Sequence, residues 1–123
     1  MTLPLVLILG SEGLVGRAVR RRLGRGAERA LVDIEPAERP EGRCFELDMG
    51  APEDIDRLFD ALSGDLHRVA GIVHLVAYYD FRNTPDARYT RVERGLEHLL
   101  RRAGERLPAD APVLYASSMA SLA

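Results

Sequence analysis

The stretch LVLILGSEGLVGRAVRRRL, residues 5–23, decides the fold. Its first five residues, 5–9, are all apolar, as in a buried parallel strand, and residues 14–23 carry apolar side chains at helical spacing. Three glycines stand where the strand passes into the helix: Gly10, Gly13 and Gly16. The first permits a sharp turn, the second a close approach to a pyrophosphate, and the third close packing of helix on strand. The helix N-terminus would then face the phosphates with free N–H groups. A tight turn that binds nothing is the alternative interpretation.

The rest of the chain alternates strand and helix signals. Strands are predicted at 30–34, 43–47, 71–77 and 113–116, and helices at 52–62 and 87–106. Because parallel strands need crossover helices, this order predicts an α/β fold of the Rossmann type. We expect a doubly wound parallel sheet of about five strands in the order 3-2-1-4-5, with helices on both faces making three layers. Residues 1–123 form a single domain in this prediction.

Composition excludes several classes of protein. Apolar residues make up 46% and charged residues 29% of the chain, as in a soluble globular protein, and a net charge of −2 argues against nucleic-acid binding. No apolar run reaches the length of a membrane span, and the N-terminus does not resemble a signal peptide, so a cytoplasmic location is expected. A single cysteine, Cys44, and three scattered histidines predict neither a disulfide nor a metal site.

All 17 basic residues are arginine. Codon bias in a GC-rich genome is the favoured explanation, but whatever the cause, no step in this chain can use a lysine ammonium. Three of the arginines, Arg20, Arg21 and Arg22, are expected largely on the solvated face of the first helix.

One acidic residue after the glycine turn stands where a ribose-binding carboxylate is expected. Asp33 lies 23 residues after Gly10, at the end of the second predicted strand. A carboxylate there can accept hydrogen bonds from both hydroxyls of an adenosine ribose and would repel a 2′-phosphate. With Glu35 nearby, this favours NAD(H) over NADP(H). An ordinary turn residue at a strand end is the alternative interpretation of Asp33.

Four segments together resemble the extended short-chain dehydrogenase/reductase family, the NAD-dependent epimerases and dehydratases: GSEGLVG at 10–16, ELDMG at 46–50, VHLVA at 73–77 and LYASSMA at 114–120. The resemblance runs along essentially the whole chain but corresponds only to the N-terminal, NAD-binding half of such an enzyme, without its C-terminal substrate lobe. It implies that Asp48 accepts a hydrogen bond from the adenine amino group, with Met49 beside the ring. It also places Ser118 at the position of the catalytic Ser/Thr.

The cofactor-binding residues that the motifs and this resemblance predict are Gly10, Ser11, Glu12, Gly13, Leu14, Val15, Gly16, Asp33, Ile34, Asp48, Met49, Leu75, Val76 and Ala77.

The chain departs from the family pattern in ways that affect chemistry. The family's Tyr-x-x-x-Lys, which supplies the acid/base step, does not occur, and the helix at 87–106 reads RVERGLEHLL where the family has NVxGTxNLL. The isolated chain is therefore expected to bind cofactor at best and to be a fragment of a longer protein. The apolar stripe of helix 87–106 is expected to be exposed unless a partner covers it, which makes this helix a candidate homodimer contact. The strand at 113–116 is expected to form a bare sheet edge.

Two functional interpretations remain open at this point. In the first, the chain is the NAD-binding portion of an epimerase/dehydratase-like oxidoreductase that acts, in a longer form, on a nucleotide sugar or a similar hydroxyl or keto substrate. In the second, it is a non-catalytic dinucleotide-binding or redox-sensing module, or a defunct remnant.

Overall fold

One parallel sheet organises the chain. The computed structural model describes residues 2–37, 42–76 and 87–116, with the side chains of 87–89 left out. The sheet has five strands: β1 (Leu5–Leu9), β2 (Glu28–Asp33), β3 (Arg43–Glu46), β4 (Val69–His74) and β5 (Val113–Tyr115). All pairs are parallel and the order is β3-β2-β1-β4-β5. The predicted α/β class and the predicted strand order are confirmed.

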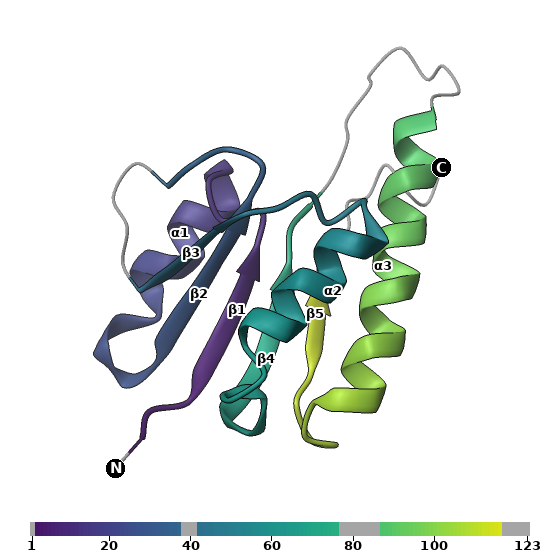
Figure 1. Cartoon of the computed structure of the whole chain (residues 1–123). Helices are drawn as coiled ribbons and strands as arrows, with labels where there is room; N and C mark the ends of the chain where they lie inside the picture. Colours follow the sequence, from purple (N-terminus) through teal and green to yellow (C-terminus); the bar gives the residue numbers. More distant parts are fainter. Residues whose placement is uncertain (1, 38–41, 77–86, 117–123) are drawn as a thin grey trace.

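The helices pack on the two faces of this sheet. They are α1 (Leu14–Arg22), α2 (Pro52–Ala61) and α3 (Ala87–Arg106), with short 3₁₀ turns η1 (Gly24–Gly26) and η2 (Leu66–Arg68). Figure 1 shows α2 and α3 side by side over one face of the sheet and α1 on the other side. Among the helices in the described part of the chain, none is long and apolar enough to cross a membrane.

Strand boundaries differ from the sequence prediction where polar residues pair early. β2 begins at Glu28, because Leu5 of β1 already pairs with it in the sheet. The Glu28 carboxylate lies at the sheet end and forms an ion pair with Arg68, 3.0 Å away, so a polar residue occupies a strand position. At the other end Ile34, predicted to be in the strand, lies beyond it and is 68% exposed. β4 is likewise shifted toward the N-terminus, running from 69 to 74 where 71–77 was predicted.

The core lies between the sheet and the α2/α3 layer. Leu7 of β1 packs in one buried cluster with Leu58 and Phe59 of α2 and Leu99 of α3, and all four are fully buried. Burying a side chain of this size stabilises the fold by about 1.5–3 kcal/mol. The cluster fixes the carboxyl ends of the central strands, where the site described below is built.

Helix α3 does not expose its apolar stripe, and that expectation was wrong. Leu99 is fully buried and Ala103 is 9% exposed, because α2 covers this face of α3. Ion pairs flank the contact: Asp56 of α2 lies 2.8 Å from His98 and 2.9 Å from Arg102. These partners hold the pKa of Asp56 below its ordinary value, Arg102 contributing most. Of the predicted stripe, Leu100 remains exposed, at 47%.

Candidate functional site

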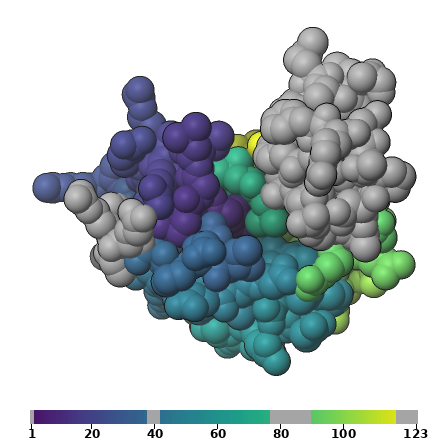
Figure 2. Space-filling model, turned by 90° about the horizontal axis from the view of Figure 1, so that it is seen from above, coloured from purple at the N-terminus to yellow at the C-terminus, as the bar shows by residue number. Residues whose placement is uncertain are grey.

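A cavity of about 390 Å³ opens at the carboxyl ends of the central strands. It lies where the chain turns to opposite sides of β1, toward β2 and β4, which is where open α/β sheets bind their ligands. Figure 2 views the molecule onto this end and shows a hollow between the purple N-terminal part of the chain and the blue part below it in this view. Its volume falls within the usual range of small-molecule sites, roughly 300–1,000 Å³.

The cavity gathers most of the residues that the sequence singles out. The predicted residues that line it are Gly10, Gly13, Leu14, Val15, Gly16, Asp33, Ile34, Asp48, Met49, Leu75 and Val76. Two further lining residues, Val32 and Leu47, were not predicted. Their positions beside Asp33 and Asp48, at strand ends on the same edge of the sheet, are the signal that could have found them. Ala77 and Ser118 lie outside the described residues.

The glycine turn brings three backbone segments into contact. Gly10 has a φ of +86°, and a Cβ there would lie 3.0 Å from the Leu75 carbonyl, so the turn excludes a side chain. A Cβ on Gly16 would lie 2.8 Å from Ser11 Cα. Gly16 therefore packs α1 against the turn itself, and not against the strand as its spacing had predicted. Gly13 has open space, its nearest neighbour being Gly10 O at 3.6 Å from a built Cβ.

The first turn of α1 lines this cavity. Gly13 is its N-cap, and no side chain among the described residues caps it. Its first turn is Leu14, Val15 and Gly16, so the turn itself carries no acidic side chain that would neutralise the partial positive charge of the helix end. Leu14 is 88% exposed and Val15 is 56% exposed, at the cavity rim. This arrangement is suited to an anion.

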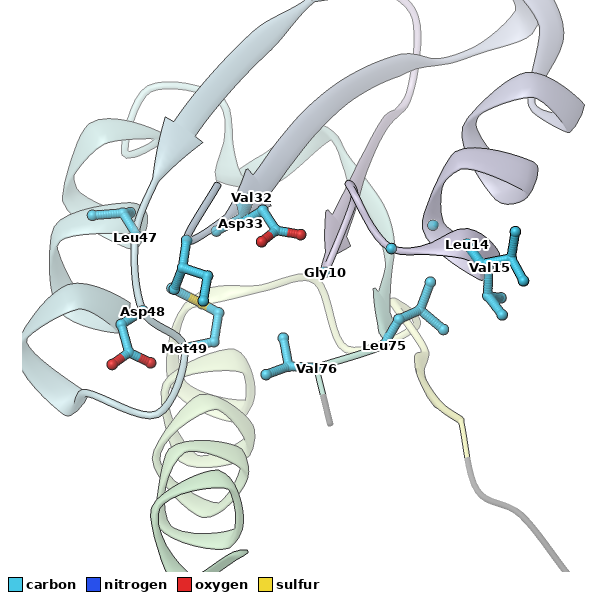
Figure 3. Close-up of a pocket in the computed structure, with 13 residues that line it drawn as sticks. Gly10, Leu14, Val15, Val32, Asp33, Leu47, Asp48, Met49, Leu75 and Val76 are labelled. Atoms are coloured by element: carbon cyan, nitrogen blue, oxygen red, sulfur yellow. The ribbon is translucent and has the colours of Figure 1, made fainter. Parts of the chain in front are cut away.

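Asp33 joins the turn to the end of β2. Its Oδ2 accepts a hydrogen bond from the Glu12 N–H at 2.9 Å, and its Oδ1 accepts one from the Glu35 N–H at 3.2 Å. In Figure 3 the carboxylate points toward the Gly10 turn. Because each carboxylate oxygen can accept two hydrogen bonds, both keep capacity for a ligand hydroxyl. The two amides thus fix the orientation of the carboxylate and leave it able to bind.

The opposite end of the cavity is formed by the loop after β3. Asp48 Oδ1 accepts from the Gly50 N–H at 2.8 Å, and Oδ2 accepts from Arg91 Nη2 of α3 at 2.6 Å. In Figure 3 this carboxylate points away from Gly10, while the buried Met49 side chain lies between the two carboxylate groups. The Arg91 contact was not predicted, because it joins two residues 43 positions apart.

Two of the predicted residues, Ser11 and Glu12, do not line this cavity. Ser11 is 1% exposed, and its Oγ donates to Glu12 Oε2 at 2.8 Å. Arg20 Nη1 donates to the same oxygen at 2.9 Å, and Arg20 is 6% exposed. The expectation that Arg20 lies on the solvated face with Arg21 and Arg22 was therefore wrong for Arg20, because the Glu12 carboxylate draws it inward. Arg21 and Arg22 are exposed as expected.

The residues at the end of β4 and just after it are apolar Leu75 and Val76, which line the cavity, and a buried histidine, His74. Leu75 N–H donates to Leu9 O at 2.8 Å, which holds Leu75 and Val76 at the cavity edge. His74 is 1% exposed and its ring centroid lies 5.4 Å from that of Tyr115. Burial lowers the pKa of His74, since the charged imidazolium would be poorly solvated there. In the described part of the chain its Nδ1 has no hydrogen-bond partner.

Fold and site together define a Rossmann-type domain with a glycine turn at its topological switch point. No protein-family model matches the chain, and no curated protein matches it in sequence.

Solved structures of short-chain dehydrogenases share this architecture. A glucose/ribitol dehydrogenase of the short-chain dehydrogenase/reductase type from Brucella melitensis matches with a TM-score of 0.81 at 18% identity, over 99% of this chain and 61% of that one. A short-chain dehydrogenase from Leptospira borgpetersenii with bound NAD⁺ matches with a TM-score of 0.74 at 17% identity, over 100% of this chain and 54% of that one. A uronate dehydrogenase variant from Agrobacterium tumefaciens, complexed with NAD, matches with a TM-score of 0.71 at 23% identity, over 95% and 42%.

These matches establish the fold. The chain has the Rossmann fold of short-chain dehydrogenases and spans about half the length of the structures it matches.

Proposed function

We propose that the chain binds NAD(H) and is the nucleotide-binding portion of an NAD-dependent oxidoreductase. The observation that carries the proposal is that one cavity contains the Gly10–Gly16 turn, the uncapped N-terminus of α1 and the Asp33 carboxylate. An adenine dinucleotide presents the matching groups, an anionic diphosphate and a ribose with two hydroxyls. Two of the structural neighbours, from Leptospira borgpetersenii and Agrobacterium tumefaciens, are named as NAD complexes, which supports the choice of cofactor.

In this proposal each part of the cavity binds one part of the dinucleotide. The N–H groups at the start of α1 bind the diphosphate, and the helix end supplies partial positive charge without a side chain. The Asp33 carboxylate, held by the Glu12 and Glu35 amides, accepts the ribose hydroxyls. The buried Met49 and the neighbouring Asp48 bind the adenine, and Val76 excludes water from its other side.

The acidic end of β2 favours NAD(H) over NADP(H). A 2′-phosphate on the ribose would sit against the Asp33 carboxylate, whose two backbone partners leave its negative charge in place. Glu35 adds a second carboxylate to the same loop. Like charges at such short range cost several kilocalories per mole unless water screens them.

Catalysis belongs to a longer form of the protein in this proposal. The bound cofactor supplies hydride transfer. Ser118 would hydrogen-bond the oxygen of a hydroxyl or keto substrate, as the family resemblance implies. We propose a sugar-type substrate, which is supported by neighbours named as uronate, glucuronic acid and aldohexose dehydrogenases. A nucleotide sugar is proposed from the family resemblance alone. We propose no turnover by the 123 residues alone, since they contain neither Tyr-x-x-x-Lys nor any lysine.

Titration of the purified chain with NADH, followed by fluorescence, tests the binding. The wild type should saturate with NADH and bind NADPH more weakly. Asp33→Asn should weaken NADH binding about tenfold or more, because a hydrogen bond to a charged group contributes roughly 1.5–3 kcal/mol. Asp110→Asn removes an exposed carboxylate remote from the cavity and should leave the affinity unchanged. A cooperatively folded wild type that shows no saturable signal at millimolar NADH would refute the proposal.

A further inference from the structure

A buried ion pair lies directly beneath the glycine turn. Glu12 stands between Gly10 and Gly13, yet its side chain is only 5% exposed. Its Oε2 lies 2.9 Å from Arg20 Nη1, and the Arg20 side chain is 7% exposed. The Ser11 hydroxyl donates to the same oxygen at 2.8 Å. The turn thus contains a carboxylate whose charge is met inside the fold by a guanidinium of α1.

That carboxylate is badly placed for anion binding unless it is compensated. The Glu12 N–H donates to Asp33, and the next residue, Gly13, is the N-cap of α1. The negative charge is therefore attached to the segment that the proposed function assigns to a diphosphate. In a poorly solvated environment a like charge acts over several ångströms. A buried charge that loses its partner is also costly to the fold.

We propose that Arg20 is a positioning residue that makes the turn receptive to a diphosphate. It holds the Glu12 side chain below the turn and cancels the charge of its carboxylate, so that the partial positive charge of the α1 N-terminus acts on the ligand unopposed. This inference rests on the proposed function, and it adds a residue that has no contact with the cavity.

The effect of the pair's charge on NADH affinity can be separated from the effect of its shape, because Glu12 and Arg20 carry charges of opposite sign. Glu12→Gln keeps the size of the side chain and an oxygen that can accept from Ser11 and Arg20, but leaves the guanidinium uncompensated. Arg20→Met keeps an unbranched chain of similar length and removes the guanidinium that lies 2.9 Å from the Glu12 carboxylate. If the pair serves electrostatics, the two variants change NADH affinity in opposite directions. If the pair only shapes the turn, both weaken it.

The experiment is a charge cycle on the whole chain, with the NADH dissociation constant and the thermal unfolding curve measured for each variant. We expect Arg20→Met to weaken NADH binding about tenfold and Glu12→Gln to tighten it. The double variant should return close to the wild type, and Arg20→Lys, which keeps the charge, should retain most of the affinity. Arg21→Met is the matched control, since it removes an exposed charge from the same helix.

The outcomes separate this inference from the proposed function. A folded wild type that does not bind NADH refutes the function itself. A wild type that binds, combined with a Glu12→Gln variant that binds NADH no more tightly, overturns the role of Arg20 alone. If Arg20→Met does not unfold cooperatively, Glu12→Gln and the double variant decide. Tighter binding by Glu12→Gln, with the double variant close to the wild type, supports the inference. Any other result in these two variants overturns it.

Discussion

Adding one methyl group to α3 at Gly95 should destabilise the fold and distort the adenine end of the cavity. The helix crosses the loop after β3 so closely that a Cβ on Gly95 would lie 2.9 Å from Gly50 Cα and from the Met49 carbonyl carbon, and closer still to Met49 O. All three atoms are backbone, so no side chain can rotate away. Met49 and its neighbour Asp48 line the cavity, so any displacement reaches the site.

The expected size follows from two opposing terms. Overpacking against a fixed backbone costs typically about 1–3 kcal/mol, and sometimes more. Replacing glycine by alanine inside a helix returns about 1 kcal/mol. Because the backbone atoms lie closer than a Cβ tolerates, the upper end of the overpacking range applies. Gly95→Ala should therefore lower the free energy of unfolding by about 2 kcal/mol, or lower Tm by roughly 6–12 °C for a domain of this size.

The same helix offers a matched control. A Cβ on Gly104 would meet nothing within 4 Å, so Gly104→Ala should gain the helix term alone, about 0.5–1 kcal/mol. Thermal and urea unfolding of the two variants, with NADH affinity measured alongside, tests the reasoning. A Gly95→Ala variant as stable as the Gly104→Ala variant, with unchanged affinity, would show that α3 does not press on the Met49 backbone.

Three other perturbations have defined outcomes. Because burial lowers the pKa of His74, the unfolded chain takes up a proton at higher pH than the folded chain does. Stability should therefore fall as the pH drops below about 6.5, by at most about 1.4 kcal/mol per pH unit. His74→Phe should abolish that slope in urea unfolding between pH 5 and 7, whereas His67→Gln, at an exposed position, should leave it intact. Arg91→Gln breaks the exposed ion pair with Asp48 and should change the free energy of unfolding by less than about 1 kcal/mol. Arg20→Met breaks the buried pair with Glu12 and should lower it by about 3–5 kcal/mol. Equal losses of the two variants in calorimetry would contradict the burial of the Arg20–Glu12 pair. Gly10→Ala should destabilise by about 1–3 kcal/mol and weaken NADH binding, and an unchanged Tm would argue against the turn as described.

Much of the fold was predictable because its signals are local. The apolar run at 5–9, the helical spacing from residue 14 and the Pro52 start of α2 each depend on neighbouring residues, and the structure has all three elements. The strand order followed from the alternation of strands and helices, since right-handed crossovers leave few arrangements. The cavity was predictable in outline for the same reason, because strand ends on one edge of a parallel sheet meet there.

What the sequence did not reveal depends on contacts between distant residues. Arg20 looks solvent-exposed by helical spacing, but it is buried because a carboxylate eight positions away draws it inward. The apolar stripe of α3 looks unpartnered until α2 is seen to cover it. The close approach of Gly95 to Met49 joins residues far apart in the chain, and periodicity in either segment carries no trace of it.

A crystal structure of the chain grown with NAD⁺ tests the proposed binding site most directly. We expect the diphosphate against the N–H groups of Gly13 to Gly16, both hydroxyls of the adenosine ribose on the Asp33 carboxylate, and the adenine beside Met49. A dinucleotide bound elsewhere on the surface, or one in this cavity whose ribose has no contact with Asp33, would contradict it.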